Sequence, residues 1–190
     1  MYNQIKSLGK QSIVYGIGGI LNQFVSVLLV PVYTRYLSPE EYGIVQLLLV
    51  TSAFVIIIAQ LGLASAIFKS ALYDKTKDTR VIYSTAFIVL AVSGLLLLAF
   101  GSVTAGFVSN LLFDTAQYSR LAWIMFATAS LDTISVLTFA RLRIEGQALQ
   151  FSIVNFAAFF FRLLLNVLFI VVLHRGAAGL MEANALQSLV

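Results

Sequence analysis

The sequence predicts an all-α membrane protein, a polytopic bundle of transmembrane helices, and three observations lead to this expectation. Hydrophobic residues make up 60% of the 190 residues and charged residues only 11%, whereas soluble domains carry roughly 45–50% and about 25%. Long uncharged stretches separate clusters of charged residues. These stretches are continuous and rich in leucine, without the alternation that is typical of a membrane β-strand.

Five stretches reach the roughly 20 apolar residues that a helix needs to cross about 30 Å of hydrocarbon. In chain order, these predicted spans are 12–33, 43–68, 81–107, 121–140 and 151–173. A further apolar stretch, 176–190, is too short to cross. We therefore expect one membrane domain, 1–190, with five full spans and the start of a sixth, as in a chain that is cut off within its sixth helix.

The first predicted span carries small and polar residues on one helical stripe. They are Ser12, Gly16, Gly19, Gln23 and Ser26. Small residues let a second helix approach closely, so helix packing explains the glycines, and contact with a substrate is the alternative. The amides of Asn22 and Gln23 need partners in hydrocarbon, which makes both residues candidates for the lining of a transport path.

The second span is preceded by a helix-start signal. We expect Ser38 to be the N-cap, Pro39 to take the first helical position, and Glu41 to complete a capping box. These roles explain the connection without any contact to substrate. Within the span, a thin polar face includes Gln60, a further candidate for the transport path.

The third span is almost wholly apolar, but the fourth and fifth each carry one charge near the middle, Asp132 and Arg162. A charge at that depth costs about 2.5–3.5 kcal/mol, so each needs a partner or a wet cavity. The two spans run antiparallel, and at about 1.5 Å per residue the two depths differ by only about 5 Å. The two side chains are therefore expected to be able to meet directly.

We hypothesise that the polar stripes of these two spans line one side of a water-filled path. Arg162 would bind an anion there, and Asp132 would orient Arg162 or exchange a proton. A buried pair that only locks two helices together is the alternative. The predicted residues of the substrate path are Arg162, Asp132, Asn22, Gln23, Gln60, Asn155 and Asn166.

The composition argues against an enzyme, and we expect neither a cofactor nor a metal ion. The chain has no cysteine and one histidine, so thiolate sites and most histidine-based schemes are excluded. The glycines at 16–19 lie inside an apolar helix and do not form a phosphate-binding loop. Paired carboxylates are missing from the predicted spans, and no nucleic-acid partner is expected.

Loop charges predict the orientation, because lysine and arginine near helix ends stay on the cytoplasmic side. One set of ends and connections holds Lys6, Lys10, Lys69, Lys75, Lys77, Arg80, Arg141 and Arg143. The opposite set holds only Arg35, Arg120 and Arg175. We therefore predict a cytoplasmic amino terminus. The first span is too long for a cleavable signal peptide.

Several segments resemble one known family. They are SIVYGIGGILN at 12–22, LVPVYTRYLSPEEYG at 29–43, LGLASAIF at 61–68 and GAAGL at 176–180. Together they resemble the polysaccharide biosynthesis and oligosaccharide flippase family, which includes O-antigen-type flippases, of the multidrug/oligosaccharidyl-lipid/polysaccharide exporter superfamily. In length, the chain corresponds to the amino-terminal part of such a protein, an incomplete first lobe of a two-lobe carrier.

The resemblance implies a multi-pass protein of the bacterial inner membrane that moves undecaprenyl-pyrophosphate-linked sugar units between leaflets for lipopolysaccharide or other polysaccharide export. Its partners would be the lipid-linked anionic oligosaccharide and membrane lipids, with a coupling ion, a polysaccharide polymerase and glycosyltransferases as further candidates. A drug or cation exporter of the same superfamily, a truncated membrane protein without transport, and an intramembrane enzyme are the alternatives.

Overall fold

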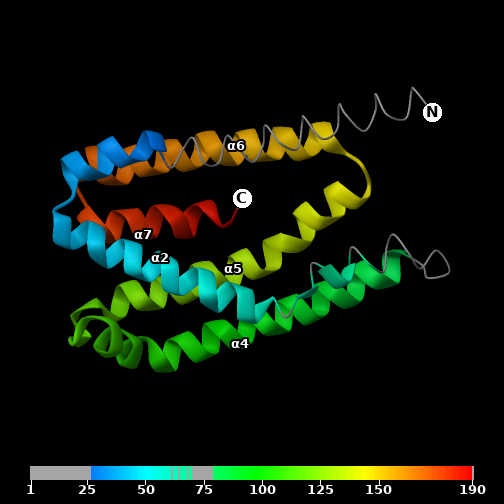
Figure 1. Ribbon diagram of the computed structural model, residues 1–190, viewed down its shortest axis with the longest axis horizontal. Coiled ribbons are helices and arrows are strands. Elements are labelled where there is room, and N and C mark those ends of the chain that lie inside the picture. Colours follow the sequence, from blue (N-terminus) through cyan, green and yellow to red (C-terminus); the bar gives the residue numbers. More distant parts are fainter. Residues whose placement is uncertain (1–26, 61, 64, 68, 70–78, 190) are drawn as a thin grey trace.

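The computed structural model describes residues 27–189 apart from 61, 64, 68 and 70–78, and this part of the chain is helical and contains no strand (Figure 1). Residues 27–36 form the first described helical segment. The elements that follow are α2 (Pro39–Ala59), α4 (Thr79–Phe113), the 3-10 helix η1 (Ala116–Tyr118), α5 (Ser119–Ile144), α6 (Ala148–Asn166), the π-helix η2 (Val167–Val172) and α7 (Gly176–Gln187).

Four helices in the described part are long and apolar enough to cross a membrane. They are Pro39–Ala59, Arg80–Phe113, Ala116–Leu142 and Ala148–Val172. The prediction of a multi-pass helical protein is therefore confirmed, and the predicted number of spans is confirmed in part. Most of the first predicted span, residues 12–26, lies outside the described residues. The sixth segment begins at Gly176 as expected, but α7 has only 12 residues.

The start of α2 follows from its sequence. The Ser38 side chain accepts a hydrogen bond from the Glu41 N–H at 3.1 Å, and the Glu41 carboxylate accepts one from the Ser38 N–H at 2.9 Å. Pro39 occupies the first turn. This is the predicted capping box, which satisfies two N–H groups that a helix start otherwise leaves unpaired.

The end of α2 corrects the prediction of one helix over 43–68. The helix stops at Ala59, with Gln60 as its C-cap. Gly62 then adopts a φ of +67°, which glycine tolerates because it has no Cβ. Residues 63, 65–67 and 69 are again helical. Apolar residues continue through the break, so hydropathy alone does not detect it.

α4 and α5 are longer than the predicted spans 81–107 and 121–140 and pack closely against each other. A Cβ on Gly101 would lie 2.3 Å from the Cβ of Phe126, so only glycine fits at this contact. The Ser130 hydroxyl donates to the Gly94 carbonyl at 2.7 Å. At the end of α4, the Ser109 hydroxyl donates to the Thr115 carbonyl at 2.6 Å, which lets the helix continue past the apolar stretch.

The fifth span follows a short connection, as predicted. It comprises α6 and its continuation η2, and it ends at Val172. α7 then turns back into the bundle, where it packs against α2, α5, α6 and η2. Figure 1 shows α7 between α6 and α2, with its last turn near the middle of the molecule.

The three connections after residue 36, after α4 and after η2 lie together at one end of the bundle, which we call the capped end. Tyr118 donates to the Glu40 carboxylate at 3.4 Å, and the rings of Tyr36 and His174 lie 6.2 Å apart. The prediction of orientation from loop charges placed these three connections on the same side of the membrane, and the structure groups them in the same way. The opposite end is formed by the end of α2, the start of α4 and the α5–α6 connection.

The main cluster of buried apolar side chains lies in the half of the bundle nearer the capped end. Its members come from the helix 27–36 and from α2, α4, α5, η2 and α7. They include Leu37, Ile44, Leu121, Ile170 and Leu180. Close packing of such side chains favours the association of helices within a membrane.

Candidate functional site

Asp132 and Arg162 lie on α5 and α6, and both are half-buried. They are close enough for the guanidinium to act on the carboxylate electrostatically. In the part of the chain that the structure describes, however, they do not form an ion pair. The Ser188 side chain, which follows α7, interacts with the Asp132 carboxylate. α7 packs against both α5 and α6.

Arg162 is tied to the first described helix through Asn166. The Asn166 amide donates to the Arg162 carbonyl at 2.8 Å and accepts a hydrogen bond from the Tyr33 hydroxyl at 2.9 Å. Asn166 is completely buried. Its side chain therefore joins the helix 27–36 to α6 and supports the backbone that carries Arg162.

Two polar side chains near this site have unused hydrogen-bonding atoms. The Nε atom of Arg162 is buried without a partner, and so are both amide atoms of Asn184 on α7. Asn184 is only 7% exposed. A buried polar atom without a partner costs about 1–3 kcal/mol, more if it is charged, so these atoms favour water or a polar ligand at this position.

Of the other predicted path residues, two lie in the part of the chain that the structure describes. Asn155 is buried and donates to the Phe151 carbonyl at 2.8 Å. Gln60 is half-buried at the end of α2. Asn22 and Gln23 lie outside the described residues. A role of any of these residues in substrate binding remains a prediction.

Sequence reasoning missed Tyr33, Asn184 and Ser188 as members of the site. Tyr33 lies at the very end of the first predicted span, and Asn184 and Ser188 lie in the segment that is too short to cross. A search for polar residues near the middle of full spans excludes all three. An asparagine inside the short apolar segment 176–190 was the available signal.

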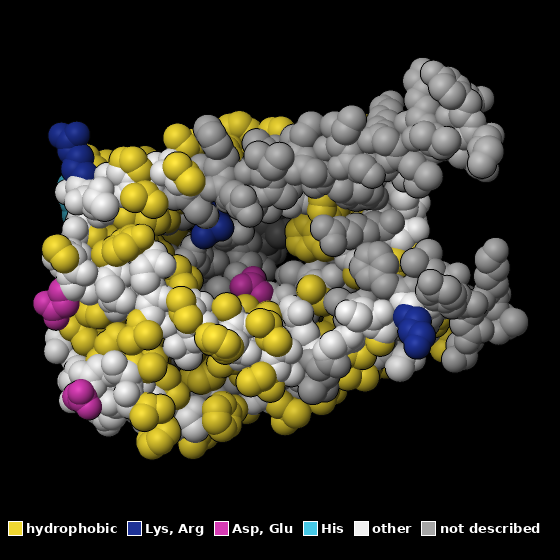
Figure 2. Space-filling model, in the orientation of Figure 1, with side chains coloured by type: hydrophobic (Ala, Val, Ile, Leu, Met, Phe, Trp, Pro, Cys, Tyr) yellow, Lys and Arg dark blue, Asp and Glu magenta, His cyan; other side chains and the backbone are white. Residues whose placement is uncertain are grey.

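Figure 2 shows a hollow near the middle of one face, with one basic and one acidic side chain close to its edge. Hydrophobic side chains lie on part of the described surface beside it. A guanidinium in such surroundings can donate parallel hydrogen bonds to a phosphate or carboxylate, and amides can pair with hydroxyl groups. The site therefore suits an anionic molecule that also carries hydroxyls.

A family model described as "Polysaccharide biosynthesis protein" matches residues 8–189. No curated protein and no solved structure matches the chain.

Proposed function

This chain belongs to the polysaccharide biosynthesis protein family, and from that premise we propose that it flips lipid-linked oligosaccharides across the bacterial inner membrane, by itself or as one lobe of a carrier. The substrate would be an undecaprenyl-pyrophosphate-linked sugar unit for O-antigen or another surface polysaccharide. The family match over nearly the whole chain is the observation that carries the proposal.

The physical problem of such transport is desolvation. A pyrophosphate and a hydrated glycan cannot enter hydrocarbon without losing their hydrogen bonds to water, whereas the lipid tail can stay in the bilayer. A polar site between α5, α6 and α7 lowers this cost, because it offers hydrogen bonds at membrane depth. The unpaired Arg162 Nε and Asn184 amide support this reading.

We assign Arg162 to the phosphate and Asn184 to sugar hydroxyls. Arg162 suits a phosphate because its planar group stays charged and donates in a fixed geometry. Asn166 already uses its amide in two hydrogen bonds, so we assign it to holding Arg162 in place. Asn22, Gln23, Gln60 and Asn155 are proposed to extend the polar path.

Asp132 has two proposed roles. It can orient the Arg162 guanidinium through its negative charge, or it can take up a proton and so weaken its hold on Arg162. The second role would couple transport to a proton gradient. Dissipating that gradient in cells would slow flipping only in the second case.

The proposed setting is the inner membrane with a cytoplasmic amino terminus, beside a polysaccharide polymerase and glycosyltransferases. A chain without cysteine allows the orientation to be tested with the single variant Lys75→Cys. We expect protection from a membrane-impermeant thiol reagent in intact cells and labelling after the membrane is opened. Labelling in intact cells would reverse the orientation.

The function is tested by inactivating the gene in its host. We expect lipid-linked oligosaccharide to accumulate on the cytoplasmic leaflet and surface polysaccharide to decrease, with both effects reversed by the restored gene. Unchanged polysaccharide together with greater sensitivity to toxic cations would indicate the drug exporter of the same superfamily. Neither effect would indicate a protein without transport of its own.

A further inference from the structure

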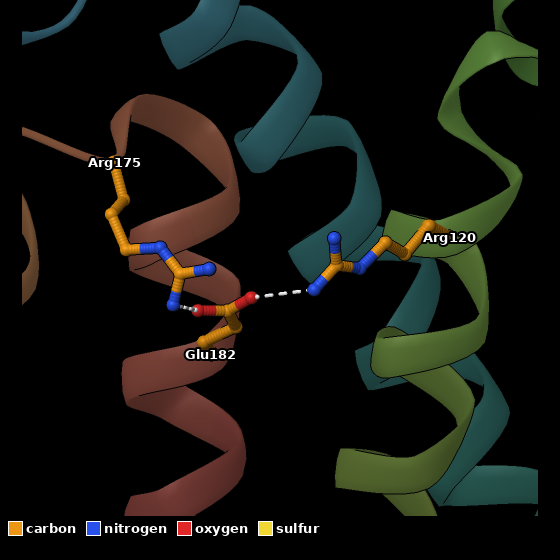
Figure 3. A network of polar contacts seen from close by, with 3 residues as sticks. All are labelled: Arg120, Arg175 and Glu182. Atoms are coloured by element: carbon orange, nitrogen blue, oxygen red, sulfur yellow. Dashed lines mark hydrogen bonds and ion pairs between the residues drawn. The ribbon is translucent and has the colours of Figure 1, made fainter.

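A second group of charged residues lies at the capped end, away from Asp132 and Arg162. Glu182 of α7 lies between two arginines, Arg120 at the start of α5 and Arg175 just before α7 (Figure 3). One carboxylate oxygen is 3.1 Å from the Arg120 Nη2, and the other pairs with the Arg175 Nη1. The three side chains therefore carry a net charge of +1, since two cations share one anion.

The arrangement leaves donors free on both arginines. The Arg120 side chain is 73% exposed and that of Arg175 is 45% exposed, whereas Glu182 is only 16% exposed. Each arginine uses one guanidinium nitrogen in its contact with Glu182, and a guanidinium has five N–H donors. Because one carboxylate holds both groups, a single bridging phosphate can reach the outer donors of both.

An apolar groove begins at this cluster. It has a volume of about 370 Å³. It is lined by all three charged residues together with Trp123, Ile124, Ala127, Phe169, Ala185 and Leu186. The Trp123 indole is fixed by donation to the Ser102 hydroxyl at 3.3 Å. A charged mouth with an apolar floor matches a molecule that has an anionic head and a hydrocarbon tail.

The position of the groove also suits such a molecule. Arg120 and Arg175 lie at ends of membrane-crossing segments, and Trp123 lies one turn inside α5. Tryptophan and arginine at this level are typical of the membrane–water interface. We propose that the groove binds an anionic membrane phospholipid, with its phosphate on Arg120 and Arg175 and an acyl chain against Trp123. This site does not depend on the flippase proposal.

Trp123 is the only tryptophan of the chain, so its fluorescence reports directly on the groove. The test titrates the purified 190-residue chain in detergent with phospholipids that carry brominated acyl chains, which quench a tryptophan on contact. Phosphatidylglycerol and phosphatidylcholine are compared with the same chains. A net charge of +1 predicts half-quenching at an about fivefold lower mole fraction of phosphatidylglycerol.

Variants separate binding from folding. The double variant R120Q/R175Q should lose the preference for phosphatidylglycerol. Glu182→Gln should increase it above the wild-type value, because the cluster then carries two net charges. Arg35→Gln removes an exposed arginine at the same end that does not line the groove, and it should keep the wild-type preference.

Equal quenching by both lipids in the wild type, or an unchanged preference in the double variant, would overturn the proposal. Two competitors identify the ligand. Inorganic phosphate should not reverse the quenching, and reversal would show a site for a free anion instead. If undecaprenyl phosphate displaces the brominated lipid better than unbrominated phosphatidylglycerol does, the ligand of the groove is the carrier lipid and not a phospholipid. Emission that shifts with protein concentration, without quenching, would show a second copy of the chain in the groove.

Discussion

The two ends of the bundle are built differently. At the capped end, a capping box starts α2, the main apolar cluster is close by, and Glu182 joins α5 to the α6–α7 connection. At the opposite end, α6 starts without a side-chain cap, and an exposed ion pair joins Arg141 to Glu145 on adjacent turns. The Arg141 guanidinium also lies 5.7 Å from the centre of the Tyr83 ring.

This difference indicates which end can separate more easily. Contacts between helices that are distant in the sequence must break before the capped end opens. At the opposite end, the Arg141–Glu145 pair is local, and Arg141 reaches α4 through an exposed contact with the Tyr83 ring. The following predictions give the expected change in the free energy of unfolding for variants in different parts of the bundle, from the largest to the smallest.

The largest loss is expected for Gly101→Ala, at the α4–α5 contact. The new Cβ would lie 2.3 Å from the Phe126 Cβ, which cannot move without its helix, so we expect a loss of about 1–3 kcal/mol. Thermal unfolding in detergent measures it. Gly43→Ala is the control, because nothing lies within 4 Å of its added Cβ. Equal stability of the two variants would contradict the close packing.

Two tyrosine variants compare a buried hydroxyl that has a hydrogen-bond partner with one that has none. Tyr33→Phe leaves the buried Asn166 oxygen without its donor, so we expect a loss of about 1–3 kcal/mol. Tyr83→Phe, near the opposite end, removes a buried hydroxyl that has no partner, and we expect no loss. Chemical unfolding curves of both variants check this. A greater loss for Tyr83→Phe would reverse the comparison.

The next smaller loss of stability is expected from substitutions at the starts of helices. Ser38→Ala removes the N-cap hydrogen bond of α2 and should cost about 1 kcal/mol. Gln147→Ala is the matched change at the start of α6, where the N-cap side chain makes no capping bond. It should be close to neutral in the same thermal assay. A clear loss from Gln147→Ala alone would mean that α6 is capped in another way.

The smallest effect is expected for Arg141→Gln. Its contact with Glu145 at 2.7 Å is an exposed pair on adjacent helical turns, and such pairs contribute little in salt. The unfolding midpoint should match that of the wild type within error. A decrease as large as that of Tyr33→Phe would show that the opposite end is held more firmly than its contacts indicate.

The predictions that the structure confirms rest on local chemistry or on hydropathy over a whole span. The α2 start follows from Ser38, Pro39 and Glu41 because a capping box involves only neighbouring residues. The spans after it follow from the apolar length that a bilayer demands. Their exact ends were missed where a polar residue such as Ser109 finds a partner inside the bundle.

The packing of α7 was not predictable in this way. Its 12 residues are too few to count as a span, so Asn184 and Ser188 were not predicted as site residues. Asp132 and Arg162 were expected to be able to meet directly. Tertiary packing placed α7 against both of their helices instead. The helix break at Gly62 was also not predicted. The residues on both sides of it are apolar, and hydropathy does not report a positive φ.

We propose that Arg162 binds the phosphate of a lipid-linked sugar, and the amount of surface polysaccharide on cells that carry Arg162→Gln tests this role most directly. At normal protein level, we expect flipping to decrease roughly tenfold or more, because a charge-assisted hydrogen bond is lost. Asp132→Asn should also impair it, whereas Asp114→Asn, in the exposed α4–α5 connection, should not. Wild-type polysaccharide with normal amounts of the Arg162→Gln protein would contradict the account.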